Sequence, residues 1–253
     1  MLTEFGNTPN IAFMNLVVDI GNTLLKYGVF EKGHHVFHAA LPPENWKELP
    51  EKISSYSIDA VIVSSVAGWP EGLMDSLHAL ANTIVLDERL AVPVLNAYAS
   101  PQTLGRDRLA NACAAAALFP GEPVLIMDAG TCLKFDFVDE DNTYHGGAIS
   151  PGLHMRFSAL HTDTIQLPLL EPVAEPPLIG RDTRGSMQSG VVNGMIAEID
   201  GIAEQYRKLY PRLRLVMTGG DAGFFLNQLK SRIFAAPNLT LIGLNAILDN
   251  LKK

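Results

Sequence analysis

The chain has 253 residues, of which 47% are hydrophobic and 18% are charged, a balance that fits a globular protein and excludes a disordered one. A chain of this length can bury a large core and can form one large domain or two of about 120 residues. The net charge of -8 disfavours nucleic acid as a partner, and the lack of any apolar run of about 18 residues argues against a membrane partner.

Hydrophobic patterns in the first half of the chain predict strands followed by helices. The expected strands are 15–20, 25–30, 34–40 and 60–65, and the expected helices are about 70–81 and 104–119. The second of these helices stops at Pro120 and Gly121, residues that end helices.

The order of elements then restarts. Strands are expected at 123–128, 132–138, 143–149 and 213–218, and helices at 151–160, 183–209, 221–231 and 242–252. The proline-rich segment 166–180 is expected to be an ordered loop. The long helix predicts one apolar stripe at a spacing of three to four residues, formed by Met187, Val191, Met195, Ile199, Ile202 and Tyr206.

The restart includes a repeated stretch, LVVDIGNTLLKYGVF at 16–30 and VLIMDAGTCLKFDFV at 124–138. With one residue skipped, four positions align: Asp19 with Asp128, Gly21 with Gly130, Thr23 with Thr131, and Lys26 with Lys134. The pattern predicts a duplicated unit of a buried strand, a tight turn and a returning strand. Chance similarity between two apolar strands is the alternative.

The repeated turn suits phosphate binding. A turn of glycine, asparagine and threonine offers backbone N–H groups and hydroxyls to an anion, and its aspartate suits a cation or a cation-bound water. Two such turns facing each other across a cleft would clamp a nucleoside triphosphate and its counterions. An ordinary β-hairpin is the alternative, but a buried strand that leads into an unpaired carboxylate favours the binding role.

With these turns in place, the chain resembles the actin/sugar-kinase/Hsp70 superfamily and, more closely, the type III pantothenate kinases. The motifs that carry the resemblance are DIGNT at 19–23, GRDR at 105–108, DAGT at 128–131, GGAISPG at 146–152, DTRGSMQSG at 182–190 and TGGDA at 218–222. They follow the family's order from about residue 15 to 250. The departures are Cys132, where a small residue is usual after Asp-x-Gly-Thr, and the first dozen residues.

The resemblance implies an α/β protein with a duplicated actin-like (ribonuclease H-like) fold, whose two similar halves surround a nucleotide cleft. The halves are expected at 15–121 and 122–253, preceded by an N-terminal extension at 1–14. A homodimer with substrate sites near the interface is also implied.

The resemblance also implies roles for individual residues. The residues expected to bind ATP are Asp19, Ile20, Gly21, Asn22, Thr23, Leu24, Leu25, Lys26 and Thr131. The residues expected to bind pantothenate are Tyr98, Gly105, Arg106, Asp107, Arg108 and Thr183. Asp107 is the expected catalytic residue, and Asp128 the expected ligand of a monovalent cation, K⁺ or NH₄⁺.

Each role has a plainer alternative. Asp107 could be an acid favoured by a helix N-terminus, Asp128 a capping acid, and Thr183 the N-cap of the long helix. Tyr98 could be a surface ring. Six histidines outside these motifs raise the question of a metal site, but surface histidines are the better interpretation: His34, His35, His38, His145, His154 and His161.

The expected function is therefore ATP-dependent phosphorylation of pantothenate to 4'-phosphopantothenate, the first step of coenzyme A biosynthesis, with Mg²⁺ bridging the phosphates. The alternatives are a kinase for another small alcohol and a non-enzymatic regulatory or accessory protein on the same fold. The N-terminus lacks a signal-peptide pattern, and Cys113 and Cys132 lack metal-type spacing, which favours reduced thiols in a cytoplasmic protein.

Overall fold

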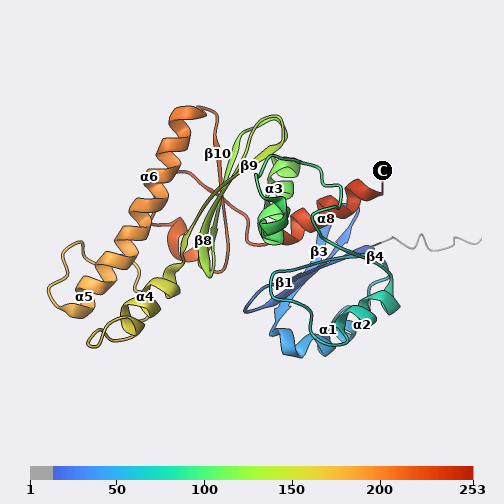
Figure 1. Cartoon of the computed structure of the whole chain (residues 1–253), viewed down its shortest axis with the longest axis horizontal. Helices are drawn as coiled ribbons and strands as arrows, with labels where there is room; N and C mark the ends of the chain where they lie inside the picture. The colour runs from blue at the N-terminus through green and yellow to red at the C-terminus, as the bar shows by residue number, and fades with distance from the viewer. Residues whose placement is uncertain (1–13, 253) are drawn as a thin grey trace, which may run out of the picture. The chain divides into compact units, whose positions relative to one another are not determined.

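The computed structural model describes residues 14–252, so the predicted N-terminal extension lies outside the described residues apart from Met14. The described residues form two compact units, one of 14–91 with 244–252 and the other of Val92–Gly243. Each unit is built around one mixed β-sheet (Figure 1). The predicted halves, 15–121 and 122–253, divide the chain by its sequence duplication and remain a prediction.

The sheet of the first unit has the strand order β3-β2-β1-β4-β5. The strands are β1 (Met14–Ile20), β2 (Leu25–Glu31), β3 (His34–Leu41), β4 (Ile58–Ser65) and β5 (Asn82–Val85). β1, β2 and β3 form antiparallel pairs, whereas β4 runs parallel to both β1 and β5. The four predicted strands are confirmed, and the short β5 was not predicted.

Side chains of β1 alternate between two environments, as the two-residue period of a strand requires. Leu16, Val18 and Ile20 join the core formed with α1 (Leu49–Lys52) and α2 (Leu73–Leu80). Asn15 faces the other side, where its Nδ2 donates to Asn245 Oδ1 of α8 (Leu239–Leu251) at 2.8 Å. Asp19 shares this side of the strand.

The predicted helix at 70–81 corresponds to α2, which is shorter, and a 3₁₀ turn, η1 (Pro43–Glu48), precedes α1.

The sheet of the second unit has the order β11-β10-β7-β8-β9-β6. Its strands are β6 (Leu95–Asn96), β7 (Val124–Ala129), β8 (Cys132–Val138), β9 (Thr143–Pro151), β10 (Arg214–Thr218) and β11 (Phe234–Ala235). The predicted strands are confirmed, and the two-residue strands β6 and β11 were not predicted. The helices that begin in this unit are α3 (Arg106–Leu118), α4 (Leu153–Thr162), α5 (Thr183–Gln188), α6 (Gly194–Leu209), α7 (Ala222–Leu226) and α8.

The two sheets repeat one topology. In the second unit β9-β8-β7 are antiparallel neighbours and β10 runs parallel to β7 and β11, which reproduces the order and directions of β3-β2-β1-β4-β5. The predicted duplication of an α/β unit is therefore confirmed. The single skipped residue also has a structural reason, because four residues separate the paired positions Ile20 and Leu25, whereas three separate Ala129 and Leu133.

Helices cover both faces of the second sheet (Figure 1). Leu125, Met127 and Phe135 point into a core with α4, α5, α6 and α7. Side chains of opposite parity, such as Lys134 and Asp136, point toward α3 on the other face. The sheet therefore separates the larger core from a polar layer against α3.

The predicted long helix at 183–209 is a continuous run of α5, a π-helical segment, η3 (Ser189–Asn193), and α6. Its predicted apolar stripe is confirmed, with Met187, Val191, Met195 and Ile199 buried in the core. These positions repeat every four residues, which exceeds the 3.6 residues of an α-helical turn, so the stripe would drift around a regular helix. The wider π-helical segment offsets part of this drift. The loop before α5 has no helix or strand between Thr162 and Thr183, as expected.

Within the described residues, no helix is both long and apolar enough to cross a membrane.

Candidate active site

The first of the two repeated turns follows β1 and is held by two short contacts. The N–H of Gly21 donates to the carbonyl of Leu24 at 3.0 Å, which closes the turn. Ser64 Oγ at the end of β4 donates to Asp19 Oδ1 at 2.6 Å, so the carboxylate, 8% exposed, is oriented by the neighbouring parallel strand. Asn22 and Thr23 at the tip are exposed. This turn can therefore present polar groups to an anion while Asp19 stays fixed below it.

The second turn, between β7 and β8, is closed in a similar way. The N–H of Gly130 donates to the carbonyl of Cys132 at 3.1 Å, and Thr131 is exposed. Gly152, the last residue of GGAISPG, donates its N–H to the carbonyl of Thr131 at 3.2 Å. A side chain at Gly152 would collide with the backbone of this turn, so the glycine permits the close approach.

Asp128 at the end of β7 has a lysine as its cross-strand partner. Lys134 lies directly opposite Asp128 in the β7–β8 register, and its Nζ is 2.8 Å from Asp128 Oδ2. The other oxygen, Oδ1, faces Gly219 of the TGGDA motif, where an added Cβ would lie only 2.6 Å from it. Gly219 has a φ of +98°, which also favours glycine.

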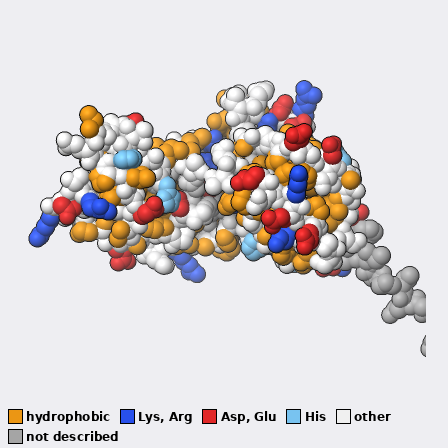
Figure 2. Space-filling model, turned by 90° about the horizontal axis from the view of Figure 1, so that it is seen from below, with side chains coloured by type: hydrophobic (Ala, Val, Ile, Leu, Met, Phe, Trp, Pro, Cys, Tyr) orange, Lys and Arg blue, Asp and Glu red, His pale blue; other side chains and the backbone are white. Residues whose placement is uncertain are grey.

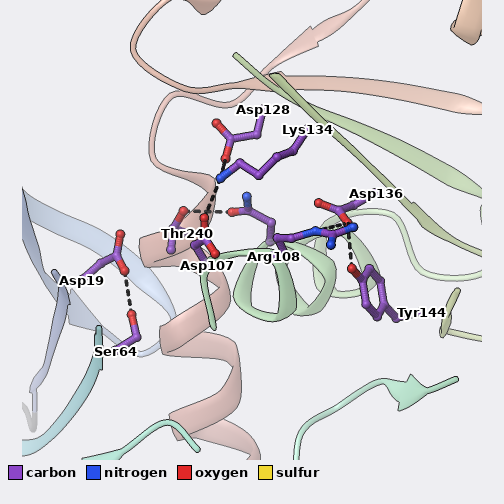
Figure 3. A network of polar contacts seen from close by, with 10 residues as sticks. Asp19, Ser64, Asp107, Arg108, Asp128, Lys134, Asp136, Tyr144 and Thr240 are labelled. Carbon is purple, nitrogen blue, oxygen red and sulfur yellow. Dashed lines mark hydrogen bonds and ion pairs between the residues drawn. The ribbon is translucent and has the colours of Figure 1, made fainter. Parts of the chain in front are cut away.

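Asp107 belongs to the same cluster. It lies in the first turn of α3, and its Oδ2 accepts a hydrogen bond from Lys134 Nζ at 2.5 Å. Figure 3 shows the lysine side chain reaching between the two carboxylates. We refer to Asp107, Asp128 and Lys134 as the Lys134 cluster. The side chains are 22%, 12% and 16% exposed, so water reaches the cluster only in part.

The charge of Lys134 is stabilised by this arrangement. Burial disfavours the ammonium, but the two carboxylates, Asp128 and Asp107, outweigh that effect and raise the pKa of Lys134 above its ordinary value. The lysine is therefore a fixed positive charge at neutral pH. In the sequence, Lys134 aligns with Lys26 of the first repeat, but the sequence analysis gave Lys134 no role in the site. Its position on the returning strand, opposite the motif residue Asp128, is the signal that could have identified it.

Gly105 precedes α3 as its N-cap residue and lies against Asp107. A Cβ at this position would be 2.6 Å from Asp107 Oδ1, closer than real Cβ contacts allow. The first residue of GRDR therefore leaves room for the carboxylate of its third residue.

Arg108, the last residue of GRDR, points into the polar layer between α3 and the sheet. Its Nε donates to Asp136 Oδ1 at 2.9 Å, and Tyr144 Oη donates to the same oxygen at 2.7 Å (Figure 3). Arg108 is 4% exposed and Asp136 is fully buried. Burial raises the pKa of Asp136 despite the opposing effect of Arg108. The guanidinium also lies 5.4 Å from the ring centre of Tyr98. Arg108 thus anchors α3 and supports Tyr98.

The structure brings together Asp107, Asp128, Gly105, Arg108 and Tyr98 within the second unit. Thr183 belongs to another segment of this unit, exposed at the start of α5. The N-cap of α5 is Asp182, whose side chain accepts from the N–H of Gly185 at 2.7 Å, so Thr183 does not have the capping role considered for it. Arg106 is half-buried at the start of α3.

Among the described residues, no group of three or more histidine, cysteine, aspartate or glutamate side chains could hold a metal ion. His34, His35 and His38 are exposed on β3, the surface position expected for them. The cysteines are free: Cys113 is buried in α3, and Cys132 is half-buried beside the second turn.

Comparisons with known proteins agree with these motifs. A family model described as type III pantothenate kinase matches residues 15–205. A type III pantothenate kinase of Christiangramia forsetii is 42% identical over 240 residues, which cover 93% of this chain and 98% of that protein.

Solved structures are similar at lower identity. A Campylobacter jejuni protein assigned to the Baf family of transcriptional activators has a TM-score of 0.60 at 19% identity and covers 94% of this chain and 98% of its own. A Sinorhizobium meliloti protein assigned as a 2-dehydro-3-deoxygalactonokinase has a TM-score of 0.57 at 14% identity, with coverages of 94% and 99%. At these identities the likeness concerns the fold, and it agrees with the predicted actin-like fold of sugar kinases.

Proposed function

The chain belongs to the type III pantothenate kinase family, and from this membership we propose that it phosphorylates the primary hydroxyl of pantothenate with ATP, the first step of coenzyme A biosynthesis. The observation that carries the proposal is the 42% identity to a type III pantothenate kinase over 93% of the chain. The regulatory alternative loses support because the chain retains Asp107 and Asp128 in one cluster.

Phosphoryl transfer asks the protein mainly to position groups and to balance charge. We assign a role in binding the phosphates of ATP to each turn by itself, residues 19–26 of the first unit and Thr131 of the second. Support comes from the exposed polar side chains at both tips and from Asp19, which Ser64 orients. Mg²⁺ would neutralise charge on the phosphates when bound, and Asp19 is the carboxylate we assign to it or to its water ligands.

Asp107 is the proposed general base. The hydroxyl oxygen of pantothenate forms the new bond to the terminal phosphorus, the bond from that phosphorus to the bridging oxygen of ADP breaks, and the hydroxyl proton passes to Asp107. Because Lys134 engages Oδ2, Oδ1 beside Gly105 is the oxygen we assign to this proton. Tyr98, Gly105, Arg106 and Thr183 are proposed to contact pantothenate. Arg108 would act on the substrate only through Tyr98, since its guanidinium is buried on Asp136.

Asp128 is proposed to balance one monovalent positive charge near the transferred phosphoryl group. The residues around it do not fit a free K⁺ or NH₄⁺ ion, because Lys134 Nζ already lies 2.8 Å from Oδ2 and would repel a second cation on the same carboxylate.

A homodimer is part of the proposal. The loop between α4 and α5 exposes large apolar side chains that a partner copy could cover: Ile165, Leu169, Val173, Leu178 and Ile179. Figure 2 shows charged side chains of both signs interspersed with apolar ones over the face in view.

We place the reaction in the cytoplasm, in keeping with the two free cysteines.

The proposal is tested by ADP release with pantothenate and with a panel of other small primary alcohols. Pantothenate-dependent ADP release with the phosphorylated product detected by mass spectrometry would support it. A higher kcat/KM for another alcohol would assign the chain to a different substrate, and no release with any alcohol would contradict the kinase activity.

A further inference from the structure

The position beside Asp128 holds a charge that belongs to the chain itself. Lys134 Nζ is within 2.8 Å of Asp128 Oδ2 and 2.5 Å of Asp107 Oδ2, and the three side chains come from β7, β8 and α3 of one compact unit. One ammonium group thus contacts two carboxylates, and the cluster carries a net charge of -1 with both carboxylates ionised.

The fold fixes this contact. Lys134 is the cross-strand partner of Asp128, on the side of the sheet that faces α3, and Asp107 lies in the first turn of that helix. A compact ammonium with three donors can serve both carboxylates at once. Because it is covalently attached, it reaches them without the translational entropy cost that a free ion pays on binding.

A second monovalent cation has little room there. An ion bound to Asp128 Oδ2 would lie next to the ammonium and be repelled by it. An ion at Oδ1 would also be repelled by the ammonium, because both oxygens belong to the one carboxylate that Lys134 contacts. A free ion could therefore bind only after Lys134 had left.

We propose that Lys134 is a built-in replacement for the monovalent cation at Asp128, so that the enzyme works without added K⁺ or NH₄⁺. This inference rests on the proposed kinase function. Removal of the lysine charge should open the position and create a requirement for K⁺ or NH₄⁺ that the unchanged protein lacks.

The test compares the wild-type protein with Lys134→Met, which keeps a long side chain and removes the charge. Both are assayed with pantothenate and MgATP in tetramethylammonium chloride, with KCl replacing it at constant ionic strength. Wild-type kcat should change by less than about twofold, whereas kcat of the variant should be low without K⁺ and rise at least about tenfold with it. Lys208→Met, which removes an exposed lysine whose Nζ lies 4.0 Å from Glu204 on α6, is the matched control.

A second measurement does not depend on catalysis. An ion that binds the folded state raises its stability, so the Tm of ligand-free Lys134→Met should increase with KCl relative to tetramethylammonium chloride. The Tm values of the wild type and of Lys208→Met should respond equally to the two salts.

Two outcomes would overturn the inference. One is a wild-type protein that K⁺ activates tenfold or stabilises selectively, which would show that a free ion binds despite Lys134. This measurement uses only the wild-type protein, so it tests the inference even if Lys134→Met does not fold. The other is a folded Lys134→Met that stays inactive at every K⁺ concentration, which would assign Lys134 to ATP or to Asp107. If no protein phosphorylates pantothenate, the proposed function fails, while the Tm comparison still tests the cation position.

Discussion

Replacing Gly105 by alanine should displace the carboxylate of Asp107 by a distance that the structure defines. The new Cβ would lie 2.6 Å from Asp107 Oδ1, and ordinary contact begins at 3.4 Å, so the oxygen has to move by about 0.8 Å. A misplacement of about 1 Å in a reacting group can cost on the order of 10²-fold in rate. We therefore expect kcat to fall about 10- to 100-fold, which corresponds to roughly 1.4–2.7 kcal/mol of barrier.

The stability of the protein should change little. Gly105 has φ -58° and ψ 131°, a conformation that alanine adopts freely. A glycine-to-alanine change at a compatible position stabilises the protein by about 0.4–1 kcal/mol through the unfolded state. This gain is offset because alanine is less favourable than glycine at the N-cap of a helix, and because the carboxylate has to move. The expected result is a folded protein of nearly unchanged Tm and unchanged ATP affinity with a low kcat.

Steady-state kinetics, calorimetry with ATP and thermal unfolding together check this expectation. Gly201→Ala in α6 is the control, because nothing lies within 4 Å of its added Cβ and the helix should gain about 1 kcal/mol without a change in kcat. If Gly105→Ala keeps kcat within about twofold of the wild-type value, the position of Asp107 Oδ1 does not limit the reaction.

Three further substitutions test other parts of the site. Asp107→Asn should lower kcat by about 10²–10⁴-fold with ATP affinity nearly unchanged by calorimetry, and a variant that keeps more than about a tenth of wild-type kcat would rule out Asp107 as the base. Arg108→Met should lower the free energy of unfolding by about 3–5 kcal/mol, because it leaves fully buried Asp136 without its cation; recovery of part of this loss in the double variant with Asp136→Leu, measured by urea unfolding, would confirm the reason. Burial opposes the charged form of Asp139, but His145 Nε2 at 2.6 Å and two backbone N–H groups hold the pKa of Asp139 below its usual value. The stabilisation from this group is therefore present above the unfolded pKa of about 3.9 and is lost as the pH falls through the folded pKa. Asp139→Asn should cost about 1 kcal/mol at pH 7 and less at lower pH, and an equal cost across an unfolding series from pH 7 to about 3 would contradict this assignment.

The fold was largely predictable because its strongest signals are local. The strands β1 and β7 are buried apolar runs that lead into an aspartate. Because this pattern occurs twice, it predicted the duplicated topology. The strands that were not predicted, β5, β6 and β11, have two to four residues and depend on tertiary pairing that a short apolar run does not reveal.

The site was only partly predictable, for a related reason. The repeated turn and the family resemblance predicted roles for Asp19, Asp107 and Asp128, but motifs along the chain do not show which charges meet. Ser64 reaches Asp19 from a strand 45 residues away, and Lys134 reaches Asp107 from the opposite side of a polar layer. The burial of Arg108 on Asp136 likewise depends on how α3 packs against β8, which no single motif encodes.

The π-helical segment at Ser189–Asn193 accommodates about one residue more than a regular α-helix needs to keep the apolar stripe on one face. Each residue of an α-helix turns the chain by about 100° and advances it by 1.5 Å. A regular α-helix would therefore turn by about 1,200° over the 12 residues from Met187 to Ile199 and leave the two side chains about 120° apart. With one residue deleted within the segment, a regular α-helix would turn by about 1,100°, so Met187 would stay on nearly the same face as Ile199. A deletion of one residue within the segment should therefore occur among functional relatives, together with a regular α-helix, whereas a deletion elsewhere in the helix should be rare.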